Sequence, residues 1–291
     1  MPTGTLLLAA QSEQAILPAI YEFFARYNIV PSEAQEFCNS AGRFARIEWV
    51  DNLDENLSDT NTWIEVSEFD ESFCEVAQVL NLDYKVRFSH SSFRIGLFCL
   101  GVNECLEQVL QKYSPLSSEV ANNNMHVAFL VGNSLELQTA ANRYGIPYFH
   151  IEATAGVARE TQLLRLISRY QPDLFAMMPS AEGLSAGLLA KLPCSVLSVS
   201  EAVVPSNAPG LVLDVASAGA GVLLASAFLL RADVNRPQLV VQQSKPLVQK
   251  REFLHSGSQQ QDLECEVLVR ALTKFTYNKV IAYGNYLYAF D

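Results

Sequence analysis

The chain has 291 residues, of which 49% are hydrophobic and 18% are charged. This composition supports one large or two modest folded domains and excludes disordered and fibrous classes. The formal net charge of −11 disfavours binding to a phosphate backbone, and no Lys/Arg run offsets it, so we expect no nucleic-acid partner.

The sequence carries no clear localisation signal and no metal-binding pattern. The first residues lack the basic leader and small-residue cleavage site of a signal peptide. The longest apolar tract, 215–230, is shorter than the about 20 residues of a membrane span, and it indicates a buried strand instead. The six cysteines form no C-x-x-C pair and have no nearby histidine, which favours buried thiols over disulfides or zinc. We therefore expect a cytoplasmic protein without a membrane partner or a metal.

The first ninety residues predict a small α+β domain. Apolar or alternating segments indicate strands at 6–9, 34–38, 43–50 and 84–88. A first helix is expected to begin just before Pro18, and Asp70 is expected to cap a second helix. The order strand, helix, strand, strand, helix, strand is typical of the ferredoxin-like arrangement. We assign residues 1–89 to this domain.

The pattern changes after Phe93, where apolar strands alternate with amphipathic helices. Strands are expected at 95–100, 127–131, 148–151, 174–178 and 196–199, with helices at 105–113, 135–144, 160–170 and 184–192. This alternation predicts an α/β domain with a Rossmann-like, mostly parallel open sheet covered on both faces. Strands at 222–230 and 239–242, a helix at 263–275 and a strand at 280–282 complete a second domain, 90–291.

Five short strings occur in an order and at a spacing that resemble one known family. They are Gly42-Arg43-Phe44, Val131-Gly132-Asn133, Tyr144-Gly145-Ile146-Pro147-Tyr148, Tyr170-Gln171-Pro172-Asp173-Leu174 and Tyr283-Gly284-Asn285. Over about 280 residues the chain is similar to formyltetrahydrofolate deformylases, which join an N-terminal ACT domain to a formyltransferase-type domain. The resemblance implies hydrolysis of 10-formyltetrahydrofolate to formate and tetrahydrofolate, a reaction of one-carbon and purine metabolism. It implies folate as substrate or ligand, no further cofactor, and a site at the carboxyl ends of the parallel strands.

The three residues that carry the family's hydrolysis are replaced in this chain. Attack by water, stabilisation of the carbonyl oxygen and protonation of the leaving nitrogen are performed in the family by an Asn, a His and an Asp. Ser198 and Ser200 stand at the Asn and His positions, in a register fixed by Leu192-Pro193 and Pro205. Asn235 stands at the Asp position. A hydroxyl and an amide have no useful basicity at neutral pH, so hydrolysis is expected to be impaired or lost.

Further positions follow from the same comparison. Val131, Gly132 and Asn133 match a substrate-binding string, after which Ser134 replaces a His. Ala181 and Phe228 replace a Met and a His, and Pro237 replaces a Gly. Glu201 is the nearest ionisable substitute that could act as a base, with Asp233 as another; alternatively, Glu201 is a solvated loop carboxylate.

The N-terminal domain departs from its family at the position where ACT domains bind amino acids. Ile16 stands where a Gly opens the first helix, and Glu13 stands where an Asp precedes it. A branched side chain there obstructs a ligand; alternatively, the domain only packs against a copy of itself, and we expect a homo-oligomer.

Three functional hypotheses stay open at this point. The first is a slow deformylase that uses Glu201. The second is a non-catalytic pseudoenzyme that binds a folate or another small molecule, or regulates a partner protein. The third is a purely structural module, which a cleft collapsed by Phe228 would favour. An open cleft lined by Ser198, Ser200 and Asn235 would favour binding.

Overall fold

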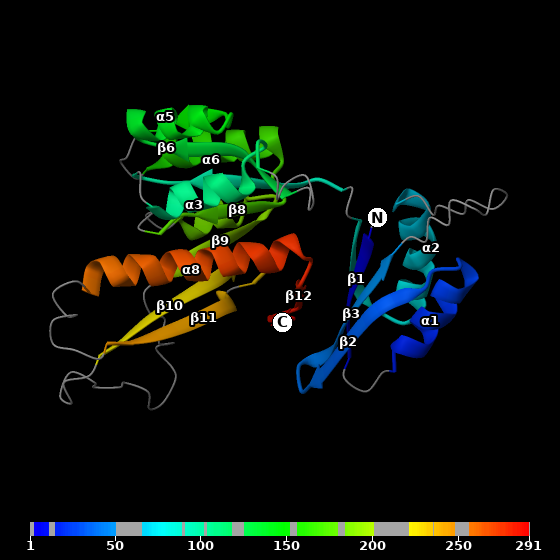
Figure 1. Ribbon diagram of the computed structural model, residues 1–291. Helices are drawn as coiled ribbons and strands as arrows, with labels where there is room; N and C mark the ends of the chain where they lie inside the picture. The colour runs from blue at the N-terminus through cyan, green and yellow to red at the C-terminus, as the bar shows by residue number, and fades with distance from the viewer. Residues whose placement is uncertain are drawn as a thin grey trace. The chain divides into compact units, whose positions relative to one another are not determined.

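A computed structural model describes residues 3–11, 15–50, 66–88, 91–101, 104–117, 125–151, 156–179, 184–200, 221–234, 236–247 and 256–290. The chain divides into two compact units, which we describe separately (Figure 1). The first comprises Met1–Ser92 together with Lys274–Asp291, and the second comprises Phe93–Thr273. The C-terminal segment, which the sequence placed in the second domain, thus groups with the first unit.

The first unit contains a four-stranded antiparallel sheet in the order β2-β3-β1-β4. Its strands are β1 (Thr3–Ala10), β2 (Pro31–Asn39), β3 (Gly42–Val50) and β4 (Asp83–Phe88), and its helices are α1 (Leu17–Arg26) and α2 (Val66–Val79). This order confirms the ferredoxin-like arrangement. α1 begins at Leu17 with Pro18 in its first turn, where the missing N–H leaves no helical bond unmade.

The predicted start of the second helix was wrong. α2 already begins at Val66, so Asp70 lies within its second turn and cannot cap it. Asp70 instead accepts a hydrogen bond from the Tyr84 hydroxyl, 2.9 Å away on β4. The acidic stretch before the helix concealed its beginning, because the first helical turn is itself polar.

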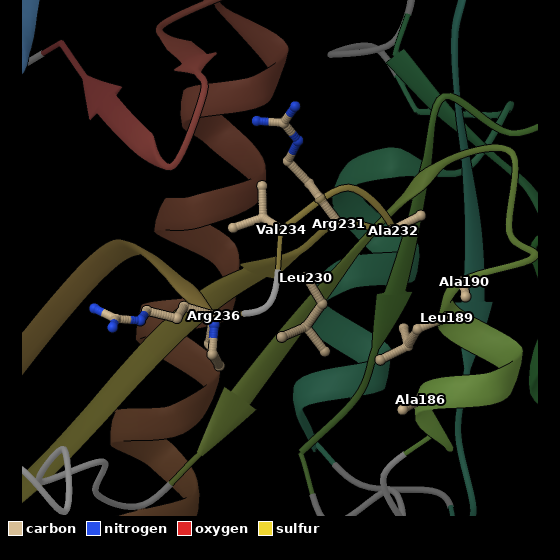
Figure 2. A pocket seen from close by; sticks show the side chains of 9 residues that line it. Ala186, Leu189, Ala190, Leu230, Arg231, Ala232, Val234 and Arg236 are labelled. Carbon is tan, nitrogen blue, oxygen red and sulfur yellow. The ribbon is translucent and has the colours of Figure 1, made fainter.

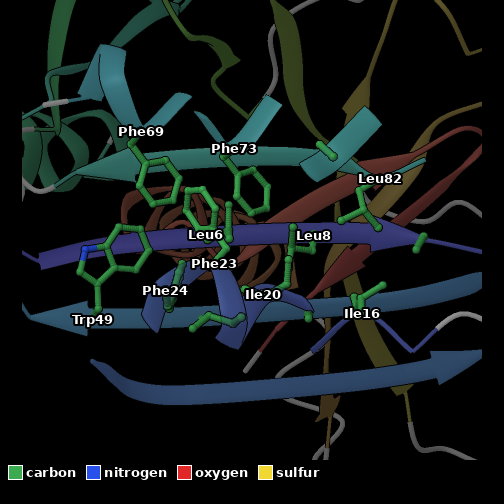
Figure 3. Packing of buried hydrophobic residues seen from close by; sticks show 14 of the residues in the cluster. Leu6, Leu8, Ile16, Ile20, Phe23, Phe24, Trp49, Phe69, Phe73 and Leu82 are labelled. Carbon is green, nitrogen blue, oxygen red and sulfur yellow. The ribbon is translucent and has the colours of Figure 1, made fainter. Parts of the chain in front are cut away.

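Both faces of the first unit's sheet are covered, which explains why β1 is apolar at successive positions. One face packs on α1 and α2 through an aromatic core that includes Phe24, Trp49 and Phe69 (Figure 3). The other face carries Leu7, Ala9 and Phe44, which pack against Ile281 and Phe290. These two residues belong to the C-terminal segment, whose strands β12 (Val280–Tyr283) and β13 (Tyr286–Ala289) form a hairpin.

Two arginines of the first unit hold the end of the long helix α8 (Ser256–Thr276). Arg87 donates from Nη1 to the carbonyl oxygens of Phe275 and Thr276, at 3.0 and 3.1 Å. Arg46 donates from Nη2 to the Tyr277 carbonyl oxygen at 3.2 Å. The last carbonyls of a helix have no helical donor, so these cations satisfy groups that folding otherwise leaves unpaired.

The second unit contains a seven-stranded sheet in the order β11-β10-β9-β8-β5-β6-β7. Five strands are parallel: β5 (Phe93–Phe98), β6 (Met125–Gly132), β7 (Tyr148–His150), β8 (Leu174–Met177) and β9 (Ser195–Ser200). β10 (Gly221–Leu230) runs antiparallel to β9, and β11 (Gln238–Leu247) runs antiparallel to β10. The mostly parallel α/β sheet predicted from the sequence is confirmed.

Helices cover both faces of this sheet. α6 (Val157–Tyr170) and α7 (Ala186–Leu189) share a core with one face, which carries Phe98, Phe175 and Val196. On the other face, Glu107 of α3 (Glu104–Tyr113) accepts hydrogen bonds from Arg143 of α5 (Leu135–Arg143) and from Tyr144. In the part of the chain that the structure describes, no helix is long and apolar enough to cross a membrane.

Candidate functional site

Two of the predicted catalytic positions, Ser198 and Ser200, lie on β9, which pairs with β10 in the second unit. Ser198 lies opposite Phe228 in the strand register, between the pairs Val196–Leu230 and Ser200–Ser226. Ser198 and Phe228 are half-buried. Because side chains alternate along a strand, Ser198 points to the same face as Val196, and Phe228 to the same face as Leu230. That face packs against α7.

A cavity of about 280 Å³ opens beside this strand pair, between α7 and the turn from β10 to β11 (Figure 2). Its lining is mainly apolar, and the residues are Ala186, Leu189, Ala190, Leu230, Arg231, Ala232, Val234, Arg236 and Pro237. Leu230 and Leu189 also pack with Val196 in the core. Leu230 pairs with Val196 near the start of β9, so the cavity lies toward the amino-terminal edge of the parallel strands, whereas the resemblance predicted a site at their carboxyl ends. Ser198 is not among the described lining residues.

The ionisable side chains among the described lining residues are Arg231 and Arg236. Arg231 forms an ion pair with Asp233. Asp233 was one of the two carboxylates predicted as a substitute base, and this ion pair engages it. Figure 2 shows both guanidinium groups extending away from Leu189 and Ala186. Arginine has no acceptor and stays protonated in proteins. The described wall of the cavity therefore supplies cations at its rim and no group that can take a proton.

The predicted substrate-binding string Val131-Gly132-Asn133 lies at the carboxyl end of β6. Val131 is fully buried, and its carbonyl oxygen accepts from the Cys99 backbone N–H at 2.9 Å. A Cβ on Gly132 would lie 2.7 Å from the Cys99 carbonyl oxygen, so the close approach of the backbones requires glycine. Asn133 has a buried Oδ1 without a hydrogen-bond partner in the described structure.

Ser134, which replaces a family His, has a structural task. Its hydroxyl accepts from the Leu137 backbone N–H at 3.3 Å and so caps α5. Its carbonyl oxygen accepts from the Tyr148 hydroxyl at 2.8 Å. Burial raises the pKa of Tyr148 above its ordinary value.

Several predicted positions lie outside the described residues: Asn235, Glu201, Ala181 and Glu13, together with the side chain of Ser200. Ile16 is described and is fully buried in the first unit's core, directly before α1. The residue at the ACT effector position is therefore part of the hydrophobic packing.

The cavity residues themselves were not predicted from the sequence. Arg236 and Pro237 belong to the string in which Asn235 was identified, and Val234 directly precedes that string. The sequence therefore pointed to this turn, but not to the residues of α7 that face it. Ala186 and Leu189 give no chemical signal, because alanine and leucine in a helix usually form ordinary core. The cavity becomes visible only when the packing of α7 against β10 is known, because the helix leaves empty space beside the β10–β11 turn.

Comparisons with known proteins agree with this architecture. No family model matches the chain. A formyltetrahydrofolate deformylase of Mycobacterium tuberculosis is 22% identical over 216 residues, which cover 70% of this chain. The match spans 63% of the length of that relative.

Solved structures extend the similarity to the whole chain. A formyltetrahydrofolate deformylase from Pseudomonas syringae superposes with a TM-score of 0.81 at 19% identity, covering 100% of this chain and 95% of that one. A glycinamide ribonucleotide transformylase from Symbiobacterium toebii reaches a TM-score of 0.53 at 18% identity over 70% of this chain and 97% of its own. The chain therefore has the fold of formyltetrahydrofolate deformylases, and the resemblance first noted in its sequence strings is confirmed.

Proposed function

We propose that this protein is a deformylase-like protein that binds a folate-type small molecule on the β9–β10 face and hydrolyses 10-formyltetrahydrofolate poorly or not at all. The observation that carries the proposal is the position of Ser198. It stands half-buried on the α7 side of the sheet, opposite Phe228, at the position where the family's Asn is expected. The strand that would present the catalytic groups is in place, and the groups are not.

The binding half of the proposal is supported by the cavity. Ligand sites are concave, mostly apolar and provided with a few polar groups, and the described wall combines seven apolar residues with two arginines. A flat heteroaromatic ring suits the apolar surface of Leu189, Leu230 and Val234. The cationic rim suits the carboxylates that folates carry.

The impaired chemistry follows from proton transfer. General acid–base catalysis contributes about 10²–10⁴ in rate, and an oxyanion donor about 10²–10³. Ser198 and Ser200 supply hydroxyls and Asn235 supplies an amide, none of which accepts a proton at neutral pH. Catalytic groups that act as a unit are not additive, so the loss of all three leaves only positioning.

The test of chemistry is formate release from 10-formyltetrahydrofolate. The unmodified protein is expected to release formate at or near the background rate. The triple variant Ser198→Asn, Ser200→His, Asn235→Asp is expected to raise the rate by about 10²–10⁴-fold. Ser198→Ala is the matched control and should change nothing. Rapid turnover by the unmodified chain, abolished by Glu201→Ala, would establish instead a rebuilt hydrolase that uses Glu201 as its base.

The test of binding is calorimetric titration with tetrahydrofolate and folic acid. Leu189→Trp fills the cavity and should abolish the heat of binding. Leu135→Trp places the same bulk on the surface of α5, where Leu135 is 75% exposed, and should leave binding intact. Equal binding by both variants would show that the ligand binds elsewhere than in this cavity. A titration of the unmodified protein without heat of binding would refute folate binding.

A further inference from the structure

The turn between β10 and β11 places two arginines at the rim of the cavity in different electrostatic settings. Arg231 directly follows β10, its side chain is 20% exposed, and it forms an ion pair with Asp233. Arg236 lies two residues before β11 and is exposed. Nothing in the described part of the chain forms an ion pair or a hydrogen bond with Arg236. One cation therefore has its carboxylate within the turn, and the other is open to a ligand.

The rest of the described cavity wall offers no polar side chain that competes with the arginines. The other lining residues are all apolar: Ala186, Leu189, Ala190, Leu230, Ala232, Val234 and Pro237. Both guanidinium groups extend away from Leu189 and Ala186 (Figure 2). A carboxylate that binds either arginine therefore stays at the mouth of the cavity, in contact with water, while the apolar part of the same ligand contacts α7.

The charge of the whole chain adds to the importance of this rim. Acidic residues outnumber basic ones by 31 to 20, and the formal net charge is −11. An anionic ligand is repelled by such a protein on average, so it is retained where a cation without an internal partner is available. Within the described cavity wall, Arg236 is that cation.

Resting on the proposed function, we propose that Arg236 recognises a carboxylate of the ligand and that Asp233 keeps Arg231 from binding a second one. The ligand class is a heteroaromatic or apolar body with a carboxylate at one end. A guanidinium suits this role because its planar set of donors matches the two oxygens of a carboxylate. A second carboxylate reaches Arg231 only by displacing Asp233, and it then gains one ion pair while the protein loses another.

Exposure to water limits the size of the effect. An ion pair in contact with water changes a dissociation constant by about fivefold, because solvent weakens the attraction and both side chains lose freedom. Salt screens such a pair, so the contribution of the carboxylate should shrink as the ionic strength rises.

The deciding experiment compares folic acid with its dimethyl ester by calorimetric titration of the full chain. The ester keeps both ring systems and lacks both carboxylate charges. The unmodified protein should bind the acid about fivefold more tightly than the ester. Arg236→Gln should bind the acid as weakly as the ester. Arg143→Gln is the matched control, because it removes an exposed cation from α5 on the opposite face of the sheet, and it should keep the full preference.

The part played by Asp233 has its own measurement. Asp233→Asn removes the carboxylate that engages Arg231, so a second carboxylate of the ligand meets a cation without a competitor. This variant should bind folic acid about fivefold more tightly than the unmodified protein and should bind the ester unchanged. An equal gain for acid and ester, or no gain for either, would overturn the role of Asp233.

Two further results separate this inference from the proposed function. If the unmodified protein binds acid and ester equally, and Leu189→Trp still abolishes both, the recognition by Arg236 is wrong and the proposed function stands. The same holds if Arg236→Gln keeps the full preference for the acid. Absence of any binding of folic acid would remove the proposed function, and this inference with it.

Discussion

The two units of this protein differ in how tightly side chains fill the space beside their sheets. In the first unit, Ile16, at the effector position predicted from the sequence, is fully buried in the aromatic core. In the second unit, α7 and the β10–β11 turn leave a cavity of about 280 Å³ near the start of β9. One predicted ligand position is thus filled by hydrophobic core, and the other region keeps open space.

The comparison teaches that one fold can fill the space beside one sheet and leave space beside another. Filling a site with large side chains adds stability, because interiors gain from close packing. Removing acids and bases from a site needs no change in packing, since Ser198 remains in its strand register. The first unit is therefore expected to be sensitive to any change in volume, and the cavity wall of the second unit to tolerate it.

The largest expected effect comes from emptying the first unit's core. Trp49 is fully buried, stacks on Phe69 at a centroid distance of 5.4 Å and meets Phe24 edge-on. Trp49→Ala should lower the free energy of unfolding by about 3–5 kcal/mol, measured by urea denaturation. Phe37→Ala is the control, because Phe37 is 39% exposed although it stacks on Tyr288, and its loss should be about 1 kcal/mol. Equal losses would mean that the first core is not tightly packed.

A matched pair of insertions tests the same contrast with a smaller effect. Ala45→Leu adds volume to the fully packed core and should destabilise the protein by about 1–3 kcal/mol. Ala186→Leu adds the same volume to the cavity wall and should change stability by less than about 1 kcal/mol, because the added atoms enter empty space. Denaturation of both variants under one set of conditions gives the difference. A large loss for Ala186→Leu would contradict the cavity.

Much of the fold could be predicted from sequence because its signals are local. The strand and helix order of both units, the start of α1 beside Pro18 and the parallel strands all follow from apolar periodicity and turn residues. The start of α2 did not, because an acidic first turn resembles a solvated loop. The direction of β10 also could not be read, since a buried strand has the same composition in either orientation.

Long-range packing explains the remaining differences. The hairpin at the C-terminus groups with the first unit because Ile281 and Phe290 cover Leu7, Ala9 and Phe44, some 230 or more residues earlier in the chain. The consecutive apolar residues of β1 signal that both sheet faces are buried, but not which segment covers the second face. The strand that carries Ser198 could be predicted from its local pattern, whereas the cavity depends on how α7 meets β10, which no local pattern records.

The smallest expected difference between the units concerns how each holds a tyrosine. Tyr84 of the first unit donates to the Asp70 carboxylate, and burial together with this partner raises its pKa. Tyr148 of the second unit donates to the Ser134 carbonyl oxygen, and burial raises its pKa, although the backbone bond opposes the shift. Each tyrosine therefore contributes stability that is complete below its unfolded pKa of about 10 and is lost as the pH rises above it.

Removal of each hydroxyl separates the two cases. Tyr84→Phe should lower the free energy of unfolding at pH 7 by about 0.5–1 kcal/mol, because the bond is partly exposed to water. Between pH 9 and 11, the free energy of unfolding should fall less steeply in Tyr84→Phe than in Tyr148→Phe. The reason is that deprotonation of Tyr84 places a phenolate against the Asp70 carboxylate, and Tyr84→Phe removes this repulsion. Denaturation across this pH range measures both slopes. A steeper flattening by Tyr148→Phe would show that burial, and not the carboxylate, dominates the alkaline response.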